Sequence, residues 1–105
     1  MARPNHLLMQ RKNDETSLKD ALMALLKSYR LERGYHLTKI QKVWPKRMGP
    51  VVAGYTREIR LRGKTLFIHL DSAPLRQELS LGKEKIRQML NEELGEPFIK
   101  EVRLL

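Results

Sequence analysis

The period of the apolar residues changes in the middle of this chain, and that change restricts the fold more than any other feature. Residues 57–62 alternate polar and apolar side chains, as a half-buried strand does. Gly63-Lys64 predicts a tight turn, and residues 65–70 return as a second strand. One face of that strand carries Leu66, Ile68 and Leu70, and the other carries Phe67 and His69. A hairpin set between helical segments indicates an α+β fold.

Apolar residues at helical spacing precede the hairpin in two stretches. The first contains Leu18, Leu22, Leu25 and Tyr29. We expect a helix over residues 17–33 that is capped by Thr16 or Ser17 and ended by Gly34. The second stretch contains Leu37, Ile40, Trp44 and Met48. Pro45 removes a backbone donor there and predicts a kink or break near Trp44, and Gly49-Pro50 marks a second interruption before a short helical turn.

A third helical pattern follows the hairpin. Asp71 or Ser72 can cap it, Pro74 stands at a permitted early position, and Gly95 ends it. Its apolar stripe is Leu75, Leu79, Ile86, Leu90 and Leu94. Gly82 allows a bend or break in the middle. Phe98, Ile99, Val102 and Leu104 suggest a final strand. The expected order is helix, helix, strand, strand, helix, strand, with one three-stranded sheet.

The length of 105 residues predicts one domain, which we assign to residues 16–105. Residues 1–15 are polar and lack a period, so we expect a flexible tail that carries a short apolar island at Leu7, Leu8 and Met9. The chain has no cysteine, which removes disulfides and thiolate chemistry. No apolar run is long enough for a signal peptide or a membrane-spanning helix, so we expect a cytoplasmic protein without a membrane partner. We favour a monomer.

The formal net charge of +9 favours a polyanionic partner, and the excess is local. Residues 27–64 contain eleven basic residues and only two acidic residues. Lys39, Lys42 and Lys46 share one helix face, and Arg60 and Arg62 share one strand face. We expect the two faces to adjoin as one phosphate-binding strip, the alternative being two separate solvated faces. The candidate nucleic-acid-binding residues are Lys39, Lys42, Lys46, Arg47, Arg57, Arg60, Arg62 and Lys64.

Enzymatic signatures are missing from the sequence. It contains no phosphate-binding glycine loop, and its three histidines are not spaced like metal ligands, so we expect neither catalysis nor a metal or cofactor. Asp71 and Ser72 near His69 are better explained as helix caps than as parts of a triad. Tyr35, Tyr55 and His36 are candidates for base stacking, although packing at turns is the commoner role of such residues.

An ordered series of motifs resembles one family. Trp44, Gly49, Ala53 and Thr56 match the W-x4-G-x3-A-x2-T run of the DciA family of bacterial replicative-helicase loaders. The resemblance continues through Gly63-Lys64-Thr65-Leu66, Ser72-Ala73, Leu75-Arg76 with Glu78-Leu79, Ile86, Leu90-Asn91, Ile99 and Val102. Among these residues, we expect Trp44 to anchor the core and Gly49 and Gly63 to permit turns. Arg76 and Glu78 are candidate partner contacts, the commoner outcome being a solvated pair.

The resemblance implies a fold similar to a type II KH domain, with a three-stranded sheet and helices on one face. It also implies a DnaB-type replicative helicase and single-stranded DNA as partners, without ATP hydrolysis, and a nucleoid-associated location. The KH signature Gly-x-x-Gly is absent, so nucleic acid would be held in another way. Two alternatives remain open: an RNA- or ribosome-associated KH-like module, and a protein-only adaptor whose basic face meets an acidic surface.

Overall fold

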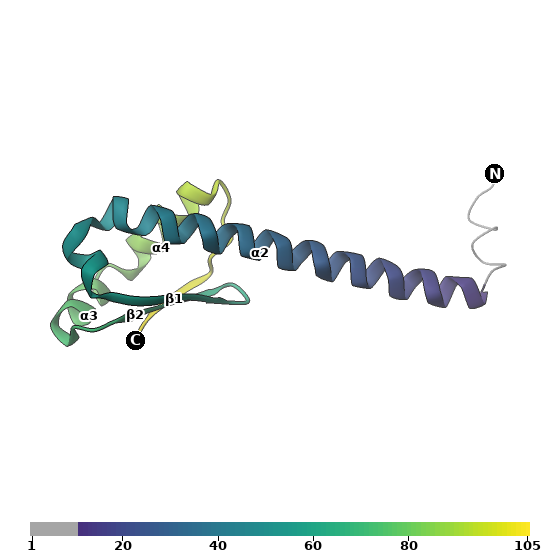
Figure 1. Ribbon diagram of the computed structural model, residues 1–105, viewed down its shortest axis with the longest axis horizontal. Coiled ribbons are helices and arrows are strands. Elements are labelled where there is room, and N and C mark those ends of the chain that lie inside the picture. The colour runs from purple at the N-terminus through teal and green to yellow at the C-terminus, as the bar shows by residue number, and fades with distance from the viewer. Residues whose placement is uncertain (1–10) are drawn as a thin grey trace. The chain divides into compact units, whose positions relative to one another are not determined.

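The computed structural model describes the backbone of residues 11–105 and the side chains of residues 16–105 (Figure 1). The elements in chain order are α2 (Arg11–Tyr55), β1 (Thr56–Arg62), β2 (Thr65–Leu70), α3 (Ala73–Ser80), α4 (Lys83–Leu94) and β3 (Glu101–Leu104). The tail expected over residues 1–10, with its apolar island, lies outside the described residues, whereas residues 11–15 belong to α2. Contacts divide the chain into two units, Met1–Glu32 and Arg33–Leu105.

Helix α2 joins the two helical stretches that the sequence separates. It begins at Arg11, so the expected cap at Thr16 or Ser17 is wrong, and it continues through Gly34, so the expected end there is also wrong. A glycine inside a helix costs only about 1 kcal/mol, and Gly34 has no positive φ, so the helix continues through it toward the buried Ile40 and Trp44.

The interruption in α2 falls at Gly49. Pro45 lies inside the helix without breaking it, whereas Gly49 leaves the helical region with φ 91° and ψ 170°. A kink or a break was predicted near Trp44, and the break is wrong. The predicted interruption at Gly49-Pro50 is confirmed. That conformation is nearly restricted to glycine, because it would place a Cβ against the backbone. Pro50 then starts the short helical turn with its fixed φ.

The sheet has the strand order β1-β2-β3, with β1 antiparallel and β3 parallel to the central β2. The hairpin is confirmed, including its turn, where Gly63 has φ 58°. The final strand is shorter than expected, because Phe98 and Ile99 precede β3 and are buried in the core.

The third helical pattern forms two helices. Ser72 caps α3, its hydroxyl accepting a hydrogen bond from the backbone N–H of Leu75 at 3.2 Å, and Gly95 ends α4 with φ 79°. The break allowed at Gly82 separates α3 from α4. Over the described residues the order is therefore one interrupted helix, two strands, two helices and a strand, which corrects the expected order.

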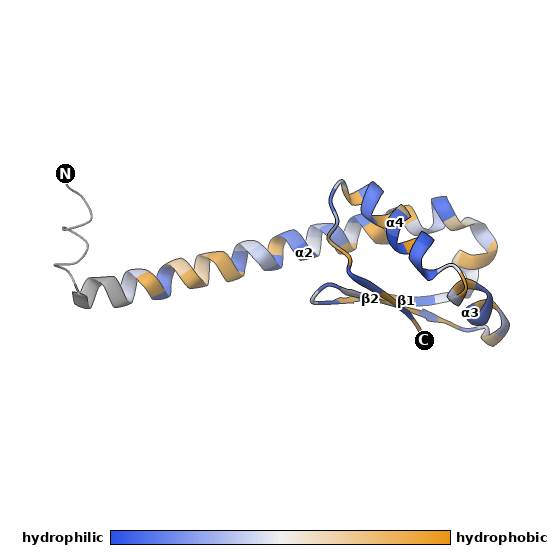
Figure 2. Ribbon diagram, turned by 180° about the vertical axis from the view of Figure 1, so that it is seen from behind, coloured by the Kyte–Doolittle hydropathy of each residue, from blue (hydrophilic) through white to orange (hydrophobic). Residues whose placement is uncertain are grey.

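The unit Arg33–Leu105 has two layers. Both views show α2 and α4 on one side of the sheet, with α3 near its end (Figure 1, Figure 2). The core between the layers consists of Ile40, Trp44, Leu61, Leu66, Ile68, Leu70, Ile86, Leu90, Phe98, Ile99 and Val102. The other side chains of the strands alternate to the opposite face, which none of the helical segments described in this unit covers and which we call the open face of the sheet.

In the unit Met1–Glu32 the described side chains lie on α2 and are almost all exposed. The expected helix is confirmed there, but its apolar stripe is not covered: Leu22 is 57% exposed and Leu25 is 67% exposed. None of the helices in the described part of the chain has the length and apolar character needed to cross a bilayer.

Candidate nucleic-acid interface

Three lysines form a basic surface on α2, which we call the lysine face: Lys39, Lys42 and Lys46. Spacings of three and four residues place them on one side of the helix, away from the buried Ile40 and Trp44. They line a hollow of about 460 Å³ together with Tyr35, Val43 and Glu93. Within the described residues none of the three lysines forms an ion pair. Their charges are therefore available to an anionic ligand.

Three other candidate cations are already in contact with groups of the chain. Arg47 donates through Nη1 to Oε2 of Glu93 on α4. Arg57 lies 3.5 Å from the carboxylate of Asp71, and Nζ of Lys64 lies 5.5 Å from the centre of the Phe98 ring. These contacts are at the surface and are worth about 1 kcal/mol or less each, so a phosphate can compete for the same groups.

Arg60 and Arg62 project from the open face of the sheet. They alternate along β1 with Ile59 and Leu61, which turn toward the helices. Arg60 lies 3.7 Å from Glu58 on the same strand, whereas Arg62 has no carboxylate partner among the described residues. Both side chains are exposed.

The lysine face and the open face lie on opposite sides of this unit. The lysines lie on the side of α2 away from the core residues Ile40 and Trp44, while Arg60 and Arg62 lie on the side of β1 away from the core-facing Ile59 and Leu61. The expectation of one continuous strip is therefore wrong. The physical reason is the two-layer fold, because the polar faces of two packed layers must point in opposite directions once their apolar faces meet.

Arg76 and Glu78, the candidate partner contacts, do not form a pair. Arg76 is half-buried and donates through Nη1 to the carbonyl oxygen of Leu70 at 3.0 Å, which ties α3 to the end of β2. Glu78 is exposed and has no ion-pair partner within the part of the chain that the structure describes. Of the two, Glu78 is the accessible one.

The aromatic candidates for stacking have different environments. His36 is only 3% exposed, lies 2.9 Å through Nε2 from Oε2 of Glu96, and packs on the Phe98 ring with a centroid distance of 4.5 Å. The stacking hypothesis is therefore wrong for His36. Tyr35 and Tyr55 are exposed.

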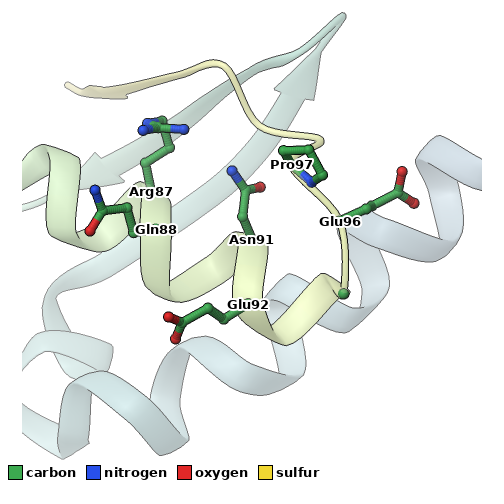
Figure 3. Close-up of a pocket in the computed structure, with 7 residues that line it drawn as sticks. Arg87, Gln88, Asn91, Glu92, Glu96 and Pro97 are labelled. Atoms are coloured by element: carbon green, nitrogen blue, oxygen red, sulfur yellow. The ribbon is translucent and has the colours of Figure 1, made fainter.

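A hollow of about 420 Å³ lies beside the end of α4 (Figure 3). Asn91 uses both ends of its side-chain amide on the backbone of Ile99: Nδ2 donates to the carbonyl oxygen at 3.0 Å, and Oδ1 accepts from the N–H at 2.8 Å. Arg87 donates to the carboxylate of Glu84 at 2.8 Å. That hydrogen bond and the charge of Arg87 lower the pKa of Glu84. These polar groups are therefore already satisfied within the chain.

The W-x4-G-x3-A-x2-T run builds the corner between α2 and β1. The indole Nε1 of Trp44 donates to Oγ1 of Thr56 at 2.9 Å, and that hydroxyl donates to the carbonyl oxygen of Val52 at 2.7 Å. Gly49 supplies the reversal that brings Thr56 back to Trp44. The expected roles of Trp44 as a core anchor and of Gly49 and Gly63 as turn residues are confirmed.

These features define a small, basic α+β domain whose recognisable motifs are structural and whose charged surfaces are open. The family model described as "Dna[CI] antecedent, DciA" matches residues 17–104, and the chain belongs to the DciA family. This is a family of helicase-loading accessory proteins, associated with the DnaB helicase, and not a known family of enzymes. Searches of curated proteins and of solved structures gave no significant match.

Proposed function

We propose that this chain is a non-enzymatic accessory protein that binds single-stranded DNA and a DnaB-type helicase and helps to place the helicase on the strand. The observation that carries the DNA-binding part is the lysine face, a set of three adjacent cations without ion-pair partners in the described structure. Membership of the DciA family supports the helicase part.

The lysine face is suited to phosphates rather than to bases. Lysine ammonium groups act as point charges on long flexible stems, so they follow a backbone without reading sequence. Their affinity arises from counterion release, and each phosphate contact on a single strand adds about 0.7 to the slope of log affinity against log salt. We therefore propose binding that depends little on sequence and strongly on salt.

Charge reversal of the lysine face tests the DNA-binding part. The triple variant Lys39→Glu, Lys42→Glu, Lys46→Glu is compared with the unchanged chain by fluorescence anisotropy on labelled oligothymidylate at several salt concentrations. Loss of three phosphate contacts predicts a salt slope that is smaller by about 2.

A matched control separates this surface from net charge alone. Lys83, Lys85 and Lys100 are exposed and lie outside the lysine face, and their triple reversal changes the net charge by the same amount. We expect this control to keep most of the affinity and of the salt slope. Equal losses in both triple variants would show that only the overall charge matters.

The helicase part has a separate test. Immobilised chain should retain a ring-shaped DnaB-type helicase, both with and without single-stranded DNA. No retention under either condition would reject the partner. A marked preference for RNA over single-stranded DNA of equal length would favour an RNA- or ribosome-associated module. Retention of the helicase without any nucleic-acid affinity at low salt would favour a protein-only adaptor.

We further propose that the fold is KH-like of type II, that the domain over residues 16–105 acts as one cytoplasmic, nucleoid-associated monomer, and that Arg47, Arg57, Arg60, Arg62 and Lys64 add phosphate contacts. The mixed three-stranded sheet with α2 and α4 on one face supports the fold assignment. Glu78 is retained as a proposed partner contact because it is accessible, while Arg76 is proposed to hold α3 in place beside it.

A further inference from the structure

The open face of the sheet carries an aromatic ring between two arginines. Phe67 lies on the central strand β2, and the register places Arg60 of β1 directly opposite it on one side and Arg103 of β3 opposite it on the other. Directly opposed residues on a sheet have Cβ atoms about 5 Å apart, so the three side chains form one cross-strand row.

This row borders a hollow that a planar group can enter. The hollow has a volume of about 170 Å³ and is lined by Arg60, Arg62, Phe67, His69 and Leu105. Phe67 and His69 are half-buried, with Phe67 kept on the outer face because Leu66 and Ile68 fill the core. An accessible ring beside an open hollow is a stacking surface.

The arginines in the row keep donors for a ligand. Arg60 approaches Glu58 through Nε at 3.7 Å, and Arg103 approaches Glu101 through Nε at 3.2 Å. Among the described residues neither arginine has a hydrogen bond from its terminal nitrogens, and Arg62 has no carboxylate partner. Guanidinium groups arranged around a ring can hold the phosphates on either side of a stacked base.

We propose that the open face is a base-stacking site for single-stranded nucleic acid, with Phe67 as the stacking ring and Arg60, Arg62 and Arg103 as phosphate contacts. This inference rests on the proposed function and adds to it a second contact surface, distinct from the lysine face. The composition of the face favours nucleic acid over a protein partner, because its few apolar side chains stand among three arginines and do not form the contiguous apolar patch that a protein interface core requires.

Removal of the ring tests the stacking contact directly. Phe67→Leu keeps an apolar side chain on an outward position, while Phe67→Tyr keeps the aromatic face. We expect Phe67→Leu to weaken binding of oligothymidylate by about 5- to 150-fold with an unchanged salt slope, and Phe67→Tyr to bind like the unchanged chain. Thermal unfolding followed by circular dichroism verifies that each variant is folded.

The ligand supplies a second control. An abasic strand of equal length has the phosphates but no bases, so the unchanged chain and Phe67→Leu should bind it equally. Leu81→Ala removes an exposed apolar side chain that lies between α3 and α4 rather than on a strand, and it should leave oligothymidylate binding unchanged.

The outcomes separate this inference from the proposed function. If the unchanged chain does not bind single strands at low salt, the proposed function fails and the stacking site fails with it. If the unchanged chain binds but Phe67→Leu binds equally well, or loses no more than Leu81→Ala, the stacking site is overturned while the proposed function stands. A Phe67→Leu variant that loses only the helicase would instead assign the open face to a protein partner and overturn the inference.

Discussion

The hydrogen bond between Trp44 and Thr56 gives a sharp test of how the corner between α2 and β1 is held. Trp44 is 1% exposed, and the only acceptor of its indole N–H within the described structure is the Thr56 hydroxyl at 2.9 Å. Thr56→Val keeps the shape of the side chain and removes the acceptor. A buried donor left without a partner costs about 1–3 kcal/mol, so we expect the free energy of unfolding to fall by about 2 kcal/mol.

Because a domain of this size loses roughly 4–8 °C for each kcal/mol, the melting temperature should fall by roughly 8–16 °C. Thr56→Ser keeps the hydroxyl and loses one half-buried methyl group, so it should cost less than about 1 kcal/mol. The assay is urea denaturation followed by far-ultraviolet circular dichroism, with the slope against urea checked for constancy.

A double-mutant cycle isolates the bond from the other effects. Trp44→Phe removes the donor, so in that background Thr56→Val no longer leaves a buried N–H without a partner. We expect a coupling energy of about 1 kcal/mol or more between the two positions. If Thr56→Val costs the same in both backgrounds, the bond does not hold the corner, and the motif spacing needs another explanation.

Three further changes test other parts of the structure. Gly49→Ala should lower the free energy of unfolding by about 1–3 kcal/mol because of its positive φ, whereas Gly34→Ala should raise it by up to about 1 kcal/mol, with both measured by urea denaturation. The pKa of Glu84 in the folded chain should lie below its usual 4.5, and Arg87→Gln should return it toward 4.5 in an NMR titration. The ion pair therefore adds to the free energy of unfolding above the pKa of Glu84 in the unfolded chain, and this contribution is lost as the pH falls through the pKa in the folded chain. Leu22→Ser should change the free energy of unfolding by less than about 0.5 kcal/mol, because the side chain is 57% exposed, and a larger loss would show that the leucine is covered in solution.

Local patterns predicted the elements whose determinants lie close together in sequence. The hairpin follows from strict alternation around Gly63, and the start of α3 follows from Ser72 and its hydrogen bond to a backbone group three residues later. Gly34 and Pro45 misled the prediction because both act through local propensity, which is weak compared with the burial of Ile40 and Trp44 in the helical segment between them.

Features that depend on distant residues were beyond sequence reasoning. The sequence makes His36 a candidate for base stacking, but Glu96, sixty positions away, and Phe98 contact its ring in the folded chain. Arg103 was not singled out, because its place beside Phe67 depends on the parallel pairing of β2 with β3, which no local signal specifies. A partial signal was present: Val102 and Leu104 alternate with Arg103, which predicts that Arg103 faces away from the core.

The separation of the two basic surfaces by a whole layer has a consequence for how a strand can bind. The lysine face and the three arginines of the open face point in opposite directions, so a strand that touches both must pass around an edge of the domain. Each surface offers about three phosphate contacts, so each contributes about −2 to the salt slope on a single strand, in addition to any contacts from Arg47, Arg57 and Lys64. Affinity measured against oligothymidylates of increasing length should therefore show the slope increasing in magnitude by about 2 once the strand is long enough to reach both surfaces. A slope that does not change with strand length would mean that only one of the two surfaces contacts DNA, and the lysine-face triple variant and Phe67→Leu would then identify which one.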